Sequence, residues 1–200
     1  NTDAPADDQR GVDRPQNSSG FATFDTQQTV STSADFALDV LAVDVDGDGD
    51  TDIVSASRDD DKIAWYENDG SQNFTAHTIS TDANSAKSVF AADVDGDGDI
   101  DVLSASRFDN KIAWYENDGS QNFTPHTIST DADEARSVFA ADLEGDGDID
   151  GPSASRADDK IARYENDGSQ NFTSHTISTA AHAAKSVFPA DCGRVRHLTA

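Results

Sequence analysis

A repeat with a constant step is the feature that most constrains this chain of 200 residues. An Asp-rich run begins at Asp44 and returns at Asp93 and Asp142, each time 49 residues further on. The run Trp-Tyr-Glu-Asn-Asp-Gly keeps the same step, from Trp65 to Trp114. Landmarks that share one ungapped period indicate an array of similar structural units, each packed on its neighbours.

Each unit contains four short runs that are rich in β-branched and aromatic residues. In the second unit these runs are 89–92, 100–106, 111–116 and 123–129. Their apolar residues follow a period of two, which is typical of β-strands. The Asn-Asp-Gly sequence at 117–119 favours a hairpin turn between the last two runs. We therefore expect each unit to be a four-stranded antiparallel meander, and a unit of roughly 40–50 residues has the size of one β-propeller blade.

The predicted fold is all-β: a partial β-propeller of four-stranded antiparallel blades, with three complete blades and a part-blade at each end. The repeat domain is predicted to span residues 21–191. The three blades are expected at about 40–82, 89–131 and 138–180.

The two ends of the chain depart from the repeat. Residues 24–31 match the last strand of a unit whose first three strands are absent, and residues 187–191 match the start of another unit. Residues 1–20 show no periodic pattern, and we expect them to form a disordered leader. Residues 192–200 do not continue the repeat and are expected to form an unrelated tail.

One acidic loop occurs in each unit: residues 44–52, 93–101 and 142–150, called here the first, second and third acidic loops. Each has carboxylates at positions 1, 3, 5 and 9, a glycine at position 6, and a backbone carbonyl available at position 7. Hard oxygen donors at this spacing suit Ca²⁺ better than Mg²⁺, which demands a tighter octahedron. The sequence thus predicts up to three calcium sites. The candidate ligands are Asp44, Asp46, Asp48, Asp50, Asp52, Asp93, Asp95, Asp97, Asp99, Asp101, Asp142, Glu144, Asp146, Asp148 and Asp150.

Two other interpretations of the loops fit the sequence less well. An EF-hand shares positions 1, 3, 5 and 6, but it needs a Glu at position 12 and helices on both sides, whereas position 12 here is Ser55, Ser104 or Ser153. Solvated acidic turns without an ion are common, but four carboxylates within nine residues repel one another unless a cation is present. The third loop is expected to bind least tightly, because Glu144 is longer than Asp.

The net charge of −25 limits the classes of partner. Such a charge repels nucleic acid, and no apolar run approaches the roughly 18 residues that a membrane helix requires. Of the 39 acidic residues, 34 are Asp, and 15 lie in the three acidic loops. The composition alone is typical of a disordered chain, but this clustering predicts order that depends on calcium.

The first two acidic loops, each followed by two apolar residues, resemble the FG-GAP/VCBS repeat. This is the calcium-binding blade of integrin α-subunit propellers and of many secreted bacterial proteins. The resemblance covers about residues 24–191. It implies a β-propeller whose acidic loop joins the first two strands of a blade, a secreted or cell-surface location, and a role in adhesion or in binding a protein or glycan ligand. It does not imply catalysis.

The chain departs from that family in two respects. Members close into rings with more blades, so we expect either the remainder of a longer propeller or self-association. The third unit also has Gly151-Pro152 where the second has Val102-Leu103, and Arg163 in place of tryptophan. Because proline cannot donate a hydrogen bond to a sheet, we expect this blade to be the least stable.

The aromatic and histidine residues are expected to be structural. Trp65 and Trp114 suit packing between blades better than sugar stacking. His77, His126 and His175 occur once per blade and are too far apart to share an ion. No nucleophile–base arrangement is evident, so we expect a non-enzymatic module. A lectin-like module and a non-catalytic appendage of a larger secreted enzyme remain the alternatives.

Overall fold

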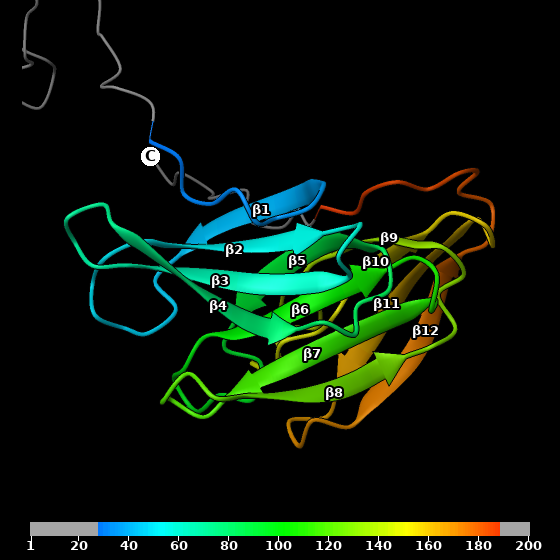
Figure 1. Cartoon of the computed structure of the whole chain (residues 1–200). Coiled ribbons are helices and arrows are strands. Elements are labelled where there is room, and N and C mark those ends of the chain that lie inside the picture. Colours follow the sequence, from blue (N-terminus) through cyan, green and yellow to red (C-terminus); the bar gives the residue numbers. More distant parts are fainter. Residues whose placement is uncertain (1–27, 189–200) are drawn as a thin grey trace, which may run out of the picture.

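The computed structural model describes residues 28–188, which form twelve β-strands in three sheets (Figure 1). The predicted leader, 1–20, and tail, 192–200, lie outside the described residues. Within the described part of the chain, no helix is long and apolar enough to cross a membrane.

Each sheet is one predicted blade. The first blade consists of β1 (Ala37–Val43), β2 (Asp52–Ser57), β3 (Lys62–Asn68) and β4 (Phe74–Ser80). The second blade consists of β5 (Ala86–Ala92), β6 (Asp101–Ser106), β7 (Lys111–Asn117) and β8 (Phe123–Ser129). The third blade consists of β9 (Ala135–Val138), β10 (Ser153–Ser155), β11 (Lys160–Asn166) and β12 (Phe172–Ser178).

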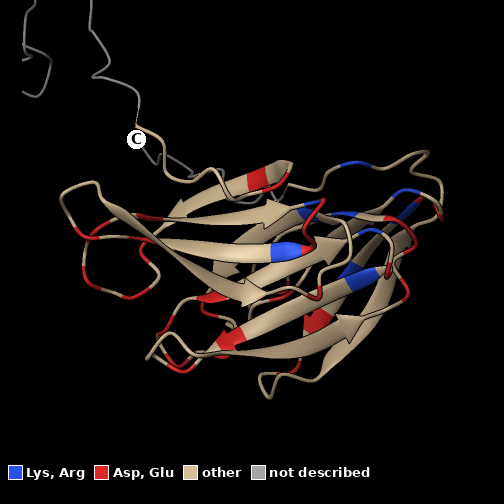
Figure 2. Ribbon diagram, in the orientation of Figure 1, with Lys and Arg blue, Asp and Glu red and all other residues tan. Residues whose placement is uncertain are grey.

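The strands of each blade are paired antiparallel in the order of the chain, which confirms the predicted meander. Because each strand reverses direction, the acidic loop and the Asn-Asp-Gly turn lie at the same end of a blade, called here the loop end. The turn between the second and third strands and the connection to the next blade lie at the other end, called here the connection end. Lysines and arginines gather mainly toward the connection end, away from the acidic loops (Figure 2).

The first strands of the blades begin three residues earlier than predicted, at Ala37, Ala86 and Ala135. These alanines have low β-propensity, and a sequence pattern therefore assigns them to the preceding loop. The structure pairs Ala86 with Ser106 and buries it completely against the neighbouring blade. Tertiary packing thus extends the strand beyond its local preference.

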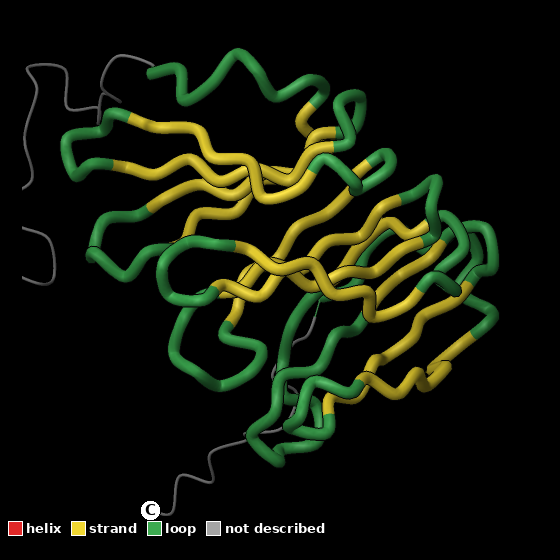
Figure 3. Tube along the Cα trace, turned by 60° about the horizontal axis from the view of Figure 1, so that its bottom comes forward, coloured by secondary structure: helices red, strands yellow, loops and turns green. Residues whose placement is uncertain are grey.

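The hydrophobic core lies between the blades, which follow one another as facing sheets (Figure 3). One cluster joins the first and second blades and includes Val54, Trp65, Val89 and Tyr115. A second cluster joins the second and third blades through the equivalent residues. Each blade therefore buries its apolar surface against its neighbours, as repeat architectures do.

The first two strands of the third blade, β9 and β10, are shorter than their equivalents, at the place where the sequence departs from the repeat. β9 has four residues and β10 has three, where the second blade has seven and six. The N–H of Phe139 donates to the carbonyl of Pro152 at 3.0 Å, but proline has no N–H to return the bond. The ladder therefore continues past Pro152 only as a bridge between Ala141 and Asp150.

The two predicted part-blades fall mostly on the limits of the described residues. Residues 28–31 and 186–188 form no strand, and the rest of each segment lies outside the described part. Val187 nevertheless follows the repeat, because its N–H donates to Ser137 Oγ at 3.3 Å. The equivalent bond one blade earlier runs from the N–H of Val138 to Ser88 Oγ at 3.5 Å, and the one two blades earlier runs from the N–H of Val89 to Asp39 Oδ2 at 3.1 Å.

Candidate metal sites

The first acidic loop joins β1 to β2 and wraps around the carboxylate of Asp44. Asp44 Oδ1 accepts a hydrogen bond from the N–H of Gly47 at 2.9 Å, and Oδ2 accepts one from Gly49 at 3.0 Å. Both glycines have positive φ, +74° and +96°, a conformation that other residues rarely adopt. The glycines therefore allow the chain to close around position 1.

The carboxylates at positions 3 and 5 are held by short local turns. Asp46 Oδ1 accepts from the N–H of Asp48 at 3.2 Å, and Asp48 Oδ1 accepts from Asp50 at 2.8 Å. Asp44, Asp46 and Asp48 each offer an oxygen within 4.8 Å of the others. Three carboxylates that converge so closely form a donor set for a hard divalent cation.

The position-9 carboxylate anchors the loop to the blade. Asp52 is completely buried, and it accepts hydrogen bonds from Val45 N–H at 2.9 Å and Asn68 N–H at 2.8 Å. It thus ties the acidic loop to the start of the β3–β4 turn. Its oxygens do not join the cluster of Asp44, Asp46 and Asp48.

The second acidic loop repeats this arrangement between β5 and β6. Asp93 accepts from the N–H groups of Gly96 at 2.8 Å and Gly98 at 3.1 Å. Here the converging oxygens belong to Asp93, Asp95 and Asp101. The two loops together bring positions 1, 3, 5 and 9 of the predicted ligand pattern into clusters.

The side chains of the aspartates at position 7 lie against the neighbouring Asn-Asp-Gly turn. A Cβ atom placed on Gly70, in the β3–β4 turn, would lie 2.4 Å from Asp50 Oδ2, and Gly119 stands in the same relation to Asp99. The side chains of Asp50 and Asp99 therefore pack against the glycine of the turn. This leaves their backbone carbonyls for the role that the sequence assigned to them.

Burial and repulsion between neighbouring charges raise the pKa values of several carboxylates in these loops. Burial raises the pKa of Asp46, and the charges of Asp48, Asp52 and Asp44 add to the effect. Burial likewise raises the pKa of Asp95. Burial raises the pKa of Asp101 to about 6, against the lowering effect of the Asn117 and Val94 N–H groups. An oxygen-only, repelling donor set of this kind fits a divalent cation such as Ca²⁺.

The third acidic loop differs from the first two. Asp142 still accepts from Gly145 at 2.6 Å and Gly147 at 3.1 Å, so the backbone closes in the same way. Glu144, however, forms an ion pair with Arg163 of β11. Within residues 28–188, the carboxylates of this loop form no cluster like the other two.

Arg163 is the residue that sequence reasoning missed. Glu144 stands at the position of Asp46 and Asp95, and Arg163 stands at the position of Trp114. Both changes occur in the same unit, and their joint occurrence was a signal for a direct contact. Arg163, which pairs with Glu144 at position 3, therefore brings a positive charge from the protein itself to this loop.

The repeated tryptophans pack between the blades, as the sequence predicted, and each also stacks on a histidine of its own blade. The rings of Trp65 and His77 stack at 4.6 Å, and those of Trp114 and His126 at 4.5 Å. Both tryptophans are buried in the clusters between blades. His126 Nε2 also lies 2.7 Å from an oxygen of Glu116.

Comparison with solved structures supports the fold. The structure resembles a lectin from Agrocybe aegerita, solved for its specific recognition of non-reducing terminal N-acetylglucosamine, with a TM-score of 0.52 and 18% sequence identity. The match covers 73% of this chain and 41% of the lectin chain, so this chain spans about two fifths of the lectin's length. At this identity the likeness shows a shared fold of repeated four-stranded blades.

Sequence comparison identifies the repeat. No curated protein matches the chain. A family model described as an FG-GAP-like repeat matches residues 44–104 and 93–150. Neither the matched repeat family nor the solved lectin is described as an enzyme. The two matched segments begin at the first and second acidic loops and together cover more than half of the 200 residues. The chain therefore belongs to the FG-GAP-like repeat family.

Proposed function

We propose that this chain is a calcium-binding, non-catalytic repeat module that serves as an interaction scaffold of a secreted or cell-surface protein. The observation that carries the proposal is the convergence of three carboxylates in each of the first two acidic loops. Calcium would supply the positive charge that these mutually repelling carboxylates, most of them partly buried, lack. Extracellular modules need only modest affinity, because dissociation constants of about 10⁻⁴–10⁻³ M suffice there.

Hydrogen bonds between blades extend the effect of each loop. Asn117 Nδ2 donates to the carbonyl of Val45, in the first acidic loop, at 3.4 Å. Asn166 Nδ2 donates to the carbonyl of Val94, in the second acidic loop, at 3.1 Å. An ordered acidic loop therefore supports the following blade as well as its own. On this basis calcium binding is coupled to the stacking of blades.

Calorimetric titration of the calcium-free full chain tests the proposal. We expect two sites of similar affinity, with the third acidic loop binding least or not at all. Asp46→Asn and Asp95→Asn should each remove one site, because each deletes a converging charge. Asp146→Asn, at position 5 of the third loop, is the matched control and should leave both sites. Absence of saturable binding, or equal effects of all three variants, contradicts the proposal.

A carbohydrate-binding module is the second candidate. It is supported by the fold shared with a lectin that recognises N-acetylglucosamine. A glycan array probed with the full chain, once with calcium and once with a chelator, separates the two. Calcium-dependent binding to a defined glycan would favour a carbohydrate-binding function. Calcium binding without any glycan signal would favour the interaction scaffold.

A further inference from the structure

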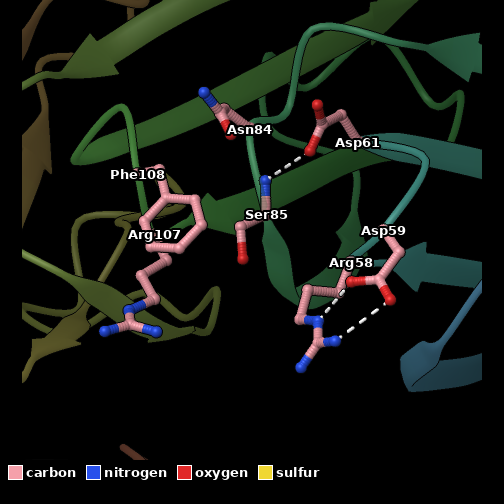
Figure 4. Close-up of a pocket in the computed structure, with 7 residues that line it drawn as sticks. All are labelled: Arg58, Asp59, Asp61, Asn84, Ser85, Arg107 and Phe108. Carbon is pink, nitrogen blue, oxygen red and sulfur yellow. Dashed lines mark hydrogen bonds and ion pairs between the residues drawn. The ribbon is translucent and has the colours of Figure 1, made fainter.

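A pocket lies between the first and second blades at the connection end, far along the strands from the acidic loops (Figure 4). Its volume is about 380 Å³. The β2–β3 turn contributes Arg58, the β4–β5 connection contributes Ser85, and the β6–β7 turn contributes Arg107 and Phe108. Two arginines thus face one pocket in a chain whose net charge is −25.

Ser85 is a lining residue of this pocket whose side chain has an unsatisfied hydrogen-bonding group. Its side chain is buried, and its hydroxyl has no hydrogen-bond partner among the described residues. Its backbone has a positive φ of 58°, and its N–H is held by Asp61 Oδ1 at 2.7 Å. The residue is therefore fixed in place, and its hydroxyl lies between the side chains of Arg58 and Arg107 (Figure 4).

The next gap, between the second and third blades, shows what fills such a pocket. The residue 49 positions after Ser85 is Glu134, with the same positive φ and the same support, since its N–H donates to Asn110 Oδ1 at 3.0 Å. Its carboxylate accepts from Arg107 at 2.5 Å, Arg156 at 2.9 Å and Arg136 at 3.3 Å. In this gap the chain supplies its own carboxylate to three arginines.

The gap between the first and second blades, called here the first gap, has the equivalent positively charged side chains. It has Ser85 where the next gap has the carboxylate of Glu134. Arg58, Lys87 and Arg107 occupy the positions of Arg107, Arg136 and Arg156. Burial lowers the pKa of Lys87, and the charges of Arg136, Arg58 and Arg107 lower it further, so these cations crowd together.

The pocket also has acids that limit its capacity. Arg58 is paired with Asp59 at 2.5 Å and 3.0 Å, and Asp61 is engaged by the N–H of Ser85. The Nε of Arg107 is buried and has no partner within the described residues. A single small anion matches this balance of charge, whereas a polyanion would meet the two aspartates.

We propose that the pocket between the first and second blades binds a small organic carboxylate, in the place that Glu134 takes in the next gap. Arg58 donates to its oxygens through Nη1 and Arg107 through its unpartnered Nε, because Arg58 Nε and Nη2 are paired with Asp59 and Arg107 Nη2 with Glu134. The Ser85 hydroxyl donates a further hydrogen bond. The ring of Phe108, which lines the pocket and is 64% exposed, packs on the apolar part of the ligand.

Titration with acetate and benzoate at constant ionic strength tests the proposal. Calorimetry on the full chain, with calcium held constant, should show one site that prefers benzoate because of Phe108. Arg58→Gln should weaken binding about tenfold or more, the usual effect of losing a hydrogen bond to a charged group. Lys62→Gln is the control, since Lys62 lies at the same end and contacts Asp60 without lining the pocket.

Two exchanges between the gaps keep the test decisive if one variant folds poorly. Ser85→Glu should fill the first pocket and abolish acetate binding. Glu134→Ser should create a second acetate site, and acetate should restore the thermal stability that this variant loses. No saturable binding by the unaltered chain, equal binding of sulfate, or an unchanged affinity in Arg58→Gln overturns the proposal.

Discussion

At the residue scale, Asp101 shows how one side chain serves both the fold and the proposed metal site. It is completely buried, and its oxygens accept from the N–H of Val94 at 2.9 Å and of Asn117 at 2.8 Å. The same carboxylate converges with Asp93 and Asp95. The loop cannot lose this ligand without also losing its anchor to the blade.

The turn glycines give a prediction about stability. Gly119 has a φ of +71°, and a Cβ there would lie 2.4 Å from Asp99 Oδ2. Gly119→Ala should destabilise the chain by about 1–3 kcal/mol, because it adds backbone strain and displaces the aspartate. The control is Gly151→Ala, whose new Cβ would meet nothing closer than 3.9 Å. Urea unfolding measures both variants, and equal effects contradict this account of the turn.

Glu134 gives a prediction about pH. Hydrogen bonds from Arg107 and Arg156, and then from Arg136, lower the pKa of Glu134 to about 2 from an ordinary value of 4.5. Since the folded pKa is the lower one, its stabilisation is complete above pH 4.5 and disappears as the pH falls toward about 2. The difference in unfolding free energy between the unaltered chain and Glu134→Gln should therefore shrink over that window. A difference that stays constant with pH contradicts the assignment.

At the element scale, the third acidic loop keeps its backbone closure, but the neighbouring strand β11 carries Arg163 where the second blade has Trp114. Arg163 pairs with Glu144 and with Glu165, the latter at 2.6 Å. This change predicts that the loop can be converted. The double variant Glu144→Asp with Arg163→Trp should raise the number of calcium sites from two to three. Glu144→Asp alone should not, because Arg163 stays beside position 3. Calorimetric stoichiometry measures both, and two sites in the double variant contradict the prediction.

The weak ladder of the third blade gives a further prediction. Pro152→Leu restores the residue found at Leu103 and supplies a backbone N–H at position 152 that can donate to the carbonyl of Phe139. We expect a gain of about 0.5–1.5 kcal/mol, the usual net contribution of one hydrogen bond. Slower amide hydrogen exchange in β9 and β10 would support this, and unchanged exchange there would contradict it.

At the scale of the whole molecule, the first blade presents the face that the other two blades bury. Val40 is 64% exposed, whereas its equivalents Val89 and Val138 are 4% and 3% exposed against the preceding blade. An apolar pocket lined by Val40, Ile53 and Tyr66 lies on the same face. Such a face is complementary to the far side of a further blade.

We therefore expect self-association through this face, with a second copy taking the place of a further blade. Val40→Asp should lower the association constant measured by sedimentation equilibrium. Phe108→Asp is the control, because Phe108 is equally exposed at 64% but lies at the connection end. Equal effects of the two variants, or a strictly monomeric chain, contradict the prediction.

The repeat made most of this architecture predictable. The constant step, the alternation within each unit and the Asn-Asp-Gly turn together predicted the three meanders and the position of the acidic loops. The pocket at the connection end was not predictable in this way, because Arg58, Ser85 and Arg107 come from three separate segments. The ion pair between Glu144 and Arg163 was also not predicted, because each residue by itself is only a departure from the repeat sequence. Both features depend on contacts across strands and between blades, and the repeat period of the sequence carries no information about such contacts.

We propose that the first two acidic loops hold calcium and that the third does not hold it comparably. Anomalous diffraction from crystals of the full chain grown with calcium tests this most directly. The account predicts two strong anomalous peaks, one within residues 44–52 and one within residues 93–101, and a weak peak or none within residues 142–150. No peak in either of the first two loops, or a strong peak only in the third, would contradict it.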